Sequence, residues 1–259
     1  MKKLSGKDRL IVALDVPTHA EALAVVDRLD NVSFFKVGIE LLMAGDVLGV
    51  IRRLQEKRGR AGGVFVDLKL AGDIGNTIAA FIRSCRAANV RFVTLVEAVP
   101  QAITASTLHA AKAARGDADT PRLLMVPLLS SLDAGDLKQS GVVGDLDAYI
   151  VRRAKVMLDL GCDGLIVSGN AIAACRAAFP SIDIVSPGIR PAWASSAGGH
   201  KRQTTPGDAI RMGSDYLVVG RPILQDQNPR AAAQRVIDEI DAALDRGARP
   251  GSSSASHVH

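Results

Sequence analysis

The chain alternates short apolar runs with longer, alanine-rich amphipathic runs along most of its 259 residues. Short apolar runs bounded by turn signals are typical of buried strands, whereas apolar residues that recur every three or four positions are typical of helices. Eight strands are expected, at Arg9–Val16, Phe34–Gly38, Val64–Lys69, Phe92–Ala98, Arg122–Leu129, Asp163–Ser168, Ile182–Pro187 and Asp215–Gly220. Helical patterns fill most gaps, including Ala20–Leu29, Asp46–Lys57, Thr77–Ala88, Gln101–Ala114, Leu146–Leu160 and Pro229–Leu244.

Strands that alternate with helices predict a parallel sheet, and eight such units predict a closed (β/α)8 TIM barrel of the α/β class. Only 3% of the residues are aromatic, so the core is expected to consist mostly of Val, Ile, Leu and Ala. An open, doubly wound sheet is the alternative, but no GxGxxG follows the first expected strand. We expect one barrel domain over residues 1–246 and a disordered tail, rich in Gly, Ser and Pro, over residues 247–259.

The charge balance points to an anionic ligand. The formal net charge is +5 and the pI is about 9.3, which is compatible with nucleic acid, an anionic surface or a small anionic substrate. No dense Lys/Arg run with interleaved aromatic residues is present, so nucleic acid is disfavoured. The three cysteines show no CxxC or metal spacing, which predicts reduced thiols in a cytoplasmic protein. No signal peptide or membrane span is expected.

Charged residues lie where the first three expected strands end. Asp15 ends the first, Lys36 lies in the second, and Asp67 and Lys69 end the third, with Asp73 shortly after. Catalytic groups of TIM barrels lie at the carboxyl ends of the strands, and a charge in an apolar strand is costly unless it is paired. A Lys between carboxylates favours the ionised form of each group. The pattern predicts a catalytic group of charges here, although a purely structural network of ion pairs is the alternative.

A second set of residues predicts an anion site. The segment DYLVVGRP is an expected strand followed by Gly220 and Arg221, and the segment SPGIRP contributes Pro187 and Arg190. Glycine lets backbone N–H groups approach a ligand, and a guanidinium can grip a phosphate through two parallel hydrogen bonds. Phosphate sites after strands seven and eight recur in TIM barrels. Helix capping or ion pairing is the alternative for Arg221.

Four further polar or aromatic residues are ambiguous from spacing alone. Ser131 is a candidate contact to a heterocycle, but a helix N-cap is the favoured interpretation. Ser168 is equally ambiguous. His200 and Trp193 lie in the long segment after the seventh strand, where both a ligand contact and an ordinary loop role are open.

Taken together, these motifs resemble orotidine 5′-monophosphate decarboxylase. The matching segments are ALD (Ala13–Asp15), FKVG (Phe35–Gly38), DLKLAGDIGNT (Asp67–Thr77), SPGIRP (Ser186–Pro191), HKRQTTP (His200–Pro206) and GSDYLVVGRPI (Gly213–Ile223). They occur in order and cover nearly the whole chain. The resemblance implies a homodimeric barrel that needs no cofactor or metal and makes UMP in the last step of de novo pyrimidine synthesis.

The resemblance also implies residue roles. Lys69 is expected to protonate C6 of the pyrimidine and Asp67 to face the substrate carboxylate. Lys36 matches the bridging lysine of the family, and Asp15 is expected to bind a ribose hydroxyl. Residues expected to enter the neighbouring subunit's site are Asp73, Ile74 and Thr77. Pro187 is expected to contact the substrate, and the residues expected around the phosphate are Arg190, His200, Gln203, Gly220 and Arg221. Ser131 matches a serine that contacts the pyrimidine, which reverses the preference for an N-cap.

The chain departs from the family pattern at several points. The usual KxxD spacing is one residue longer here, and a bulge at Gly72 is expected to absorb the insertion, since glycine accepts a positive φ. Glu97 stands where a histidine is common. His200 stands where a glutamine is usual, so either His200 or Gln203 is expected to contact the ligand.

Two other functions remain open at this stage. One is a Mg²⁺-dependent sugar-phosphate decarboxylase or aldolase of the same superfamily, which also carries a DxK motif. Lys36 and GIRP argue against it. The other is a barrel that binds nucleotide phosphates without catalysis.

Overall fold

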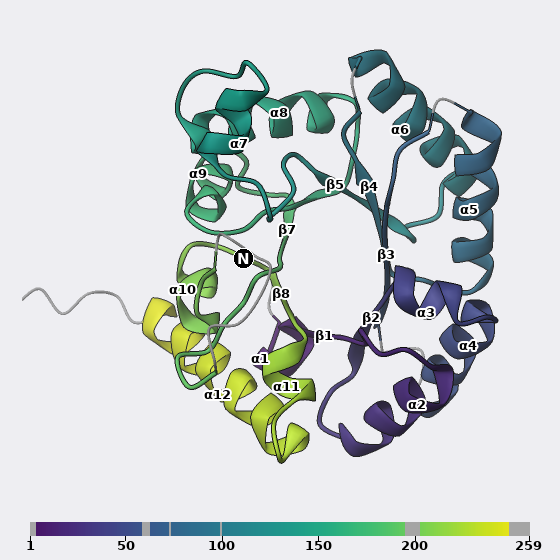
Figure 1. Ribbon diagram of the computed structural model, residues 1–259, viewed down its shortest axis with the longest axis vertical. Coiled ribbons are helices and arrows are strands. Elements are labelled where there is room, and N and C mark those ends of the chain that lie inside the picture. The colour runs from purple at the N-terminus through teal and green to yellow at the C-terminus, as the bar shows by residue number, and fades with distance from the viewer. Residues whose placement is uncertain (1–3, 59–62, 73, 99, 195–202, 249–259) are drawn as a thin grey trace, which may run out of the picture.

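The computed structural model describes residues 4–58, 63–72, 74–98, 100–194 and 203–248. Eight parallel strands form a closed barrel in the order β1 to β8 (Figure 1). Their bounds are β1 Leu10–Ala13, β2 Phe34–Gly38, β3 Gly63–Leu70, β4 Phe92–Val96, β5 Arg122–Val126, β6 Gly164–Ile166, β7 Asp183–Ser186 and β8 Tyr216–Val219. The predicted TIM barrel is therefore confirmed.

Helices surround the barrel on all sides (Figure 1). The long ones are α2 His19–Arg28, α4 Val47–Arg58, α5 Gly75–Ala87, α6 Gln101–Arg115, α8 Leu146–Asp159, α9 Ala171–Ala178 and α12 Pro229–Ala248. The short ones are α1 Gly6–Arg9, α3 Ile39–Met43, α7 Ala134–Gln139, α10 Pro206–Arg211 and α11 Arg221–Leu224. Helix α12 runs two residues past the expected domain boundary at 246, and the rest of the expected tail lies outside the described residues. Within the described residues, no helix has the length and apolar character needed to cross a bilayer.

The core has two layers. The outer layer, between the strands and the helices, consists of Val, Ile, Leu and Ala with few exceptions, as expected. The barrel interior differs, because its base is filled by Phe34, Phe65, Phe92 and Tyr216. Phe92 packs against Tyr216 with ring centroids 5.1 Å apart and nearly perpendicular planes, an arrangement that aromatic quadrupoles favour. These rings fill the base of the barrel, away from the carboxyl ends of the strands.

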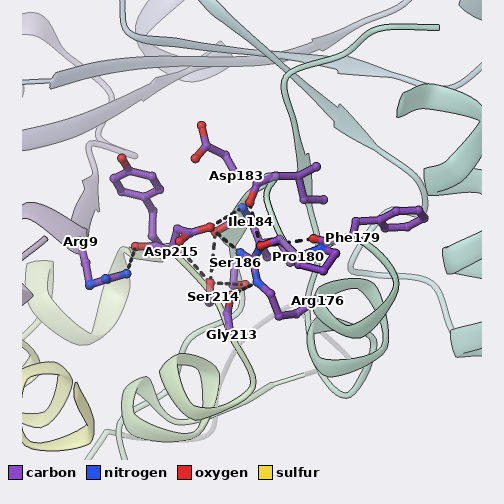
Figure 2. A network of polar contacts seen from close by, with 12 residues as sticks. Arg9, Arg176, Phe179, Pro180, Asp183, Ile184, Ser186, Gly213, Ser214 and Asp215 are labelled. Atoms are coloured by element: carbon purple, nitrogen blue, oxygen red, sulfur yellow. Dashed lines mark hydrogen bonds and ion pairs between the residues drawn. The ribbon is translucent and has the colours of Figure 1, made fainter. Parts of the chain in front are cut away.

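Strands β7 and β8 are tied together by a buried polar network (Figure 2). The Arg176 guanidinium on α9 pairs with Asp215, and the same carboxylate accepts a hydrogen bond of 3.0 Å from the Ile184 N–H. The Asp215 carbonyl accepts from Arg9 at 3.0 Å. Ser214 donates to Ser186 at 2.7 Å. A satisfied buried network of this kind fixes geometry, so the two loops that follow β7 and β8 start from a rigid base.

Candidate active site

The cavity follows from the alternation of side chains along the strands. Side chains of successive strand residues point to opposite faces, and the buried residues inside the barrel include Ile11 and Ala13 of β1, Leu124 and Val126 of β5, and Tyr216 and Val218 of β8. Two residues after Ala13 and Val218, the inward positions are held by Asp15 and Gly220, whereas Leu128 follows Val126. A cavity of about 260 Å³ opens at this level. Its lining residues are Ala13, Asp15, Lys36, Phe65, Asp67, Lys69, Val126, Leu128, Ser130, Ile166, Ser168, Pro187, Gly188, Arg190, Val218, Gly220 and Arg221.

One wall of the cavity carries charges of alternating sign. The Lys36 Nζ atom lies 3.0 Å from an Asp15 carboxylate oxygen and 3.5 Å from one of Asp67. The Lys69 Nζ atom donates to the other oxygen of Asp67 at 2.8 Å. The Lys36 and Asp67 side chains are only 10% and 12% exposed, whereas that of Lys69 is 41% exposed. Lys36 and Asp67 are therefore fixed inside the wall, and the Lys69 ammonium faces the open space.

The surroundings keep Asp67 ionised. Burial alone would raise the pKa of this carboxyl group. The charges of Lys36 and Lys69, with hydrogen bonds from Lys69 and Thr94, outweigh the burial and hold the pKa of Asp67 below its ordinary value of 3.8. A carboxylate that receives two ammonium groups and a hydroxyl is a stable anion near neutral pH. Any anionic group of a ligand placed beside it would be repelled.

Strand β3 is irregular at this wall. It pairs with β4 through Val66↔Val93 and then through Leu70↔Leu95, so three residues of β3 lie opposite one residue of β4. Lys69 has a φ of 51°, in the left-handed region, which costs a non-glycine residue about 1–2 kcal/mol. The bulge that accommodates the two additional residues of β3 is therefore at Lys69.

The expectation of a bulge at Gly72 is wrong. Gly72 follows the end of β3, and its φ is not positive. Its backbone N–H and carbonyl are both held by the Thr107 hydroxyl, at 3.1 and 3.0 Å. The adjacent α6 helix therefore fixes Gly72 in an ordinary backbone conformation.

A second wall of the cavity, formed after β7 and β8, carries two arginines. Arg190 and Arg221 both line the cavity, and both also line a smaller pocket beside Trp193. Burial, and secondly the like charge of Arg221, lower the pKa of Arg190. No carboxylate among the described residues pairs with either guanidinium, and the buried Nε atom of Arg190 has no hydrogen-bond partner there. Two adjacent cations without a counter-charge form a binding site for an anion.

The remaining wall, formed after β5 and β6, is neutral. Ser130 and Ser168 line the cavity there, whereas the predicted Ser131 is exposed and does not. Ser131 is not the N-cap of α7 either, because Asp133 holds that position with a capping box to Asp136. The Ser168 hydroxyl is buried and without a hydrogen-bond partner among the described residues. It is available to a polar group of a ligand.

Several predicted residues lie elsewhere. Ile74 and Thr77 are exposed around the start of α5 and do not line this cavity. Gln203 is exposed just before the short bridge between Ile189 and Thr204 and does not line it either. Asp73 and His200 lie outside the described residues. Glu97, which stands in place of a common histidine, is paired with Arg153 of α8.

Thr94, Ser130 and Ser168 received no role among the predicted site residues. All three are uncharged and of a common type, so neither charge nor cost of burial distinguishes them in the sequence. The alternation along β4 was the available signal for Thr94, because Thr94 lies two residues after the inward-facing Phe92. Within the described residues, no group of three or more His, Cys, Asp or Glu side chains is arranged to hold a metal ion.

Comparisons with known proteins agree with this geometry. A model of the "Orotidine 5′-phosphate decarboxylase / HUMPS family" matches residues 8–236. An orotidine 5′-phosphate decarboxylase of Rhodopseudomonas palustris (strain BisB5) is 43% identical over 242 residues, which are 92% of this chain and 97% of the relative. One of Methylobacterium sp. (strain 4-46) is 42% identical over 247 residues, 93% of this chain and 98% of the relative. The crystal structure of the Lactobacillus acidophilus enzyme superposes with a TM-score of 0.73 at 26% identity, covering 90% of this chain and 98% of that one.

Proposed function

The chain belongs to the orotidine 5′-phosphate decarboxylase / HUMPS family, and we propose that it decarboxylates orotidine 5′-monophosphate to UMP. The observation that carries the proposal is that one cavity is lined by the alternating row of Asp15, Lys36, Asp67 and Lys69 and by two arginines that pair with no carboxylate of the described residues. The substrate has the complementary layout, with a carboxylate on the pyrimidine at one end and a phosphate at the other. The proposed product places the enzyme at the final step of pyrimidine nucleotide synthesis.

Lys69 is proposed to be the general acid. Cleavage of the bond between C6 and the carboxylate releases CO₂ and leaves an electron pair on C6. An adjacent ammonium group stabilises that charge and then delivers its proton to C6, so the products are UMP, CO₂ and a neutral lysine. The Lys69 Nζ atom is held at 2.8 Å from Asp67 and is the more exposed of the two lysines, which leaves its remaining protons for the substrate.

Asp67 is proposed to face the carboxylate of the substrate. Two carboxylates about 4 Å apart repel by roughly 4 kcal/mol at an effective dielectric near 20, and departure of CO₂ relieves this repulsion. Enzymes lower barriers by about 8–23 kcal/mol, so repulsion supplies a part only. Stabilisation of the carbanion by Lys69 and orientation of the substrate supply the rest.

The phosphate is proposed to bind Arg190 and Arg221, with the backbone at Gly220 approaching it. Phosphate binding far from the reacting carbon orients the substrate and supplies binding energy that the reacting end can use. Ser130 or Ser131 and Ser168 are proposed to meet polar edges of the pyrimidine, above an apolar floor that includes Phe65 and Val126. Pro187 lines the same cavity and is proposed to contact the substrate. His200 and Gln203 remain candidates for the same phosphate end.

A homodimer with shared sites is proposed as the active form. Ile74 is 61% exposed and lies close in sequence to Asp73 and Thr77, the residues that the family resemblance assigns to a neighbouring subunit's site. Ile39 and Met43 of α3 are 60% and 78% exposed, and exposed apolar side chains of this size favour an interface. The protein is proposed to act in the cytoplasm.

A Mg²⁺-dependent sugar-phosphate enzyme is the second candidate, and Lys36 argues against it. Its Nζ atom lies between Asp15 and Asp67, at 3.0 and 3.5 Å, where a divalent cation would otherwise bind the two carboxylates. A phosphate-binding barrel without catalysis is disfavoured by the placement of the Lys69 ammonium on the open side of the wall.

The test is a spectroscopic assay with the purified protein. We expect orotidine 5′-monophosphate absorbance to fall and UMP to accumulate in equal amount, at a rate unchanged by EDTA. Turnover that disappears with EDTA and returns with Mg²⁺ would favour the second candidate. Tight binding of UMP without turnover would favour the non-catalytic barrel.

A further inference from the structure

Thr94 lies beside the charged wall, on the adjacent strand β4, and does not line the cavity. It is the middle residue of that strand and is 1% exposed. A buried hydroxyl needs hydrogen-bond partners, because burying it without them is costly. Its partners therefore show what the residue is for.

Both partners of the Thr94 hydroxyl belong to the charged wall. The oxygen accepts a hydrogen bond of 3.0 Å from the backbone N–H of Lys69. The same hydroxyl donates to an Asp67 carboxylate oxygen at 2.8 Å, and this oxygen also accepts from the Lys69 Nζ atom. One hydroxyl thus contacts the backbone of one charged residue and the side chain of the other.

The bulge in β3 explains why a side chain is needed here. Between Val66↔Val93 and Leu70↔Leu95, only Thr94 of β4 faces the three residues of β3 that end in Lys69. The Thr94 hydroxyl receives the Lys69 N–H at this irregularity. It thereby supports Lys69 in a backbone conformation, with φ of 51°, that a lysine adopts only under constraint.

We propose that Thr94 is a positioning residue for the decarboxylation, because its hydroxyl fixes the Lys69 backbone and the Asp67 carboxylate in one mutual geometry. The inference rests on the proposed function of the same site. Only a group that both accepts and donates a hydrogen bond can do this. Serine retains that group at position 94, whereas valine and alanine do not.

The experiment compares Thr94→Val, Thr94→Ser and Thr94→Ala in steady-state decarboxylation of orotidine 5′-monophosphate. Loss of a hydrogen bond to a charged group corresponds to roughly a 10- to 100-fold change in rate. We expect Thr94→Val to lower kcat by about that factor with KM changed less than about threefold, because the substrate contacts remain. Thr94→Ser is expected to keep kcat within about threefold of wild type.

Thr104→Val is the matched control. Thr104 is also a fully buried threonine, and its hydroxyl contacts the Ala98 backbone N–H and carbonyl, each at 3.0 Å, rather than a charged side chain. We expect it to lower the melting temperature without changing kcat. If Thr94→Val does not fold, Thr94→Ser and Thr94→Ala form a second pair, which differs only by the hydroxyl.

A pH profile gives a readout that simple destabilisation would not move. The Thr94 hydrogen bond is one of the contacts that lower the pKa of Asp67, which also faces Lys36 and Lys69. Losing that bond raises the pKa of Asp67, so the acidic limb of the kcat profile is expected to move to higher pH in Thr94→Val.

Equal kcat in Thr94→Val and wild type, or in Thr94→Ser and Thr94→Ala, would overturn the proposal. A rise in KM at unchanged kcat would overturn it too, since that result marks a binding role. Absence of turnover in the wild-type protein would contradict the proposed function itself. The two failures are therefore distinct.

Discussion

Asp67 is the residue on which the charges of the site converge. Its carboxylate is contacted by two ammonium groups and by the Thr94 hydroxyl, and the Asp67 side chain is 12% exposed. The charged form is favoured over the neutral form in the folded protein, relative to the unfolded chain. Folding is therefore linked to the ionisation of this group.

This linkage predicts the direction in which stability changes with pH. The folded-state pKa of Asp67 lies below the ordinary 3.8, so in acid the unfolded chain takes up this proton first. The stabilisation is complete above the unfolded pKa and is lost as the pH falls through the lower, folded pKa. We expect the free energy of unfolding of wild type, minus that of Asp67→Asn, to be constant above about pH 5 and to decrease below pH 3.8.

Urea unfolding at a series of pH values measures this difference. Asp159→Asn is a suitable comparison, because Asp159 is an exposed carboxylate paired with Lys155 within α8, where a screened pair contributes little. If the difference in free energy of unfolding between wild type and Asp67→Asn stayed constant throughout the acid range, the lowered pKa of Asp67 in the folded protein would be contradicted.

Charged site residues were predictable from the sequence, whereas neutral ones were not. A charge in an apolar strand is costly unless it is paired, which distinguishes four residues in the sequence. The structure brings these residues into one wall of the cavity: Asp15, Lys36, Asp67 and Lys69. Thr94 and Ser168 are uncharged, so no cost of burying a charge distinguishes them in the sequence. Their roles can be inferred only from the groups that surround their hydroxyls in the structure. The choice between Ser130 and Ser131 depends on one residue of loop register, which local patterns do not determine.

At the scale of elements, β3 is the part of the barrel that departs from regularity. The expected strand 64–69 is confirmed, but its end is bulged, with Lys69 in the left-handed region. Lysine has no intrinsic preference for that conformation. Because glycine accepts a positive φ, the sequence predicted the bulge at Gly72 instead. The decisive contact comes from the Thr94 hydroxyl on the adjacent strand, which no local pattern reveals.

The strain at Lys69 predicts an inverted order of stability for two variants. Lys69→Gly and Lys69→Ala both lose the ammonium group, but only glycine accepts φ of 51° without a steric penalty. We expect Lys69→Gly to be about 1 kcal/mol more stable to urea than Lys69→Ala. At Lys155, within the regular helix α8, the glycine variant should instead be the less stable by about 1 kcal/mol.

If the alanine variant at position 69 were the more stable of the two, as at Lys155, the left-handed conformation of Lys69 would be contradicted.

The other elements followed their sequence patterns more closely than β3. Each expected strand was found, although most end earlier than predicted because the sequence pattern continues beyond the last residue that pairs with a neighbouring strand. Short helices such as α7 and α11 contain too few residues to show helical periodicity.

At the scale of the whole molecule, the barrel separates stability from chemistry. Aromatic rings fill its base, and ion pairs such as Arg176–Asp215 tie the amino ends of its strands together (Figure 2). The carboxyl ends carry the partly exposed lysine and two arginines that pair with no carboxylate of the described residues. The repeated alternation of strands and helices in the sequence was enough to predict the closed barrel, whereas the expectation that Asp73, Ile74 and Thr77 enter a second subunit's site rests on the family resemblance alone.

Shared sites in a dimer predict complementation between two inactive variants. A hybrid of Lys69→Ala and Asp73→Ala subunits has one doubly altered site and one site with both native residues, if Asp73 acts across the interface. Mixing and reassociating the two variants is expected to restore about a quarter of wild-type activity, because about half of the dimers are hybrids with one intact site. No recovery from a mixture shown to contain hybrids would place Asp73 in its own subunit's site.

The role of Lys69 is tested most directly by the turnover of Lys69→Ala. The account predicts a folded protein that still binds UMP but decarboxylates orotidine 5′-monophosphate at least about 10²- to 10⁴-fold more slowly, because the proton donor for C6 is gone. Activity within about tenfold of wild type would contradict the account, since general acid catalysis of this kind contributes more than that.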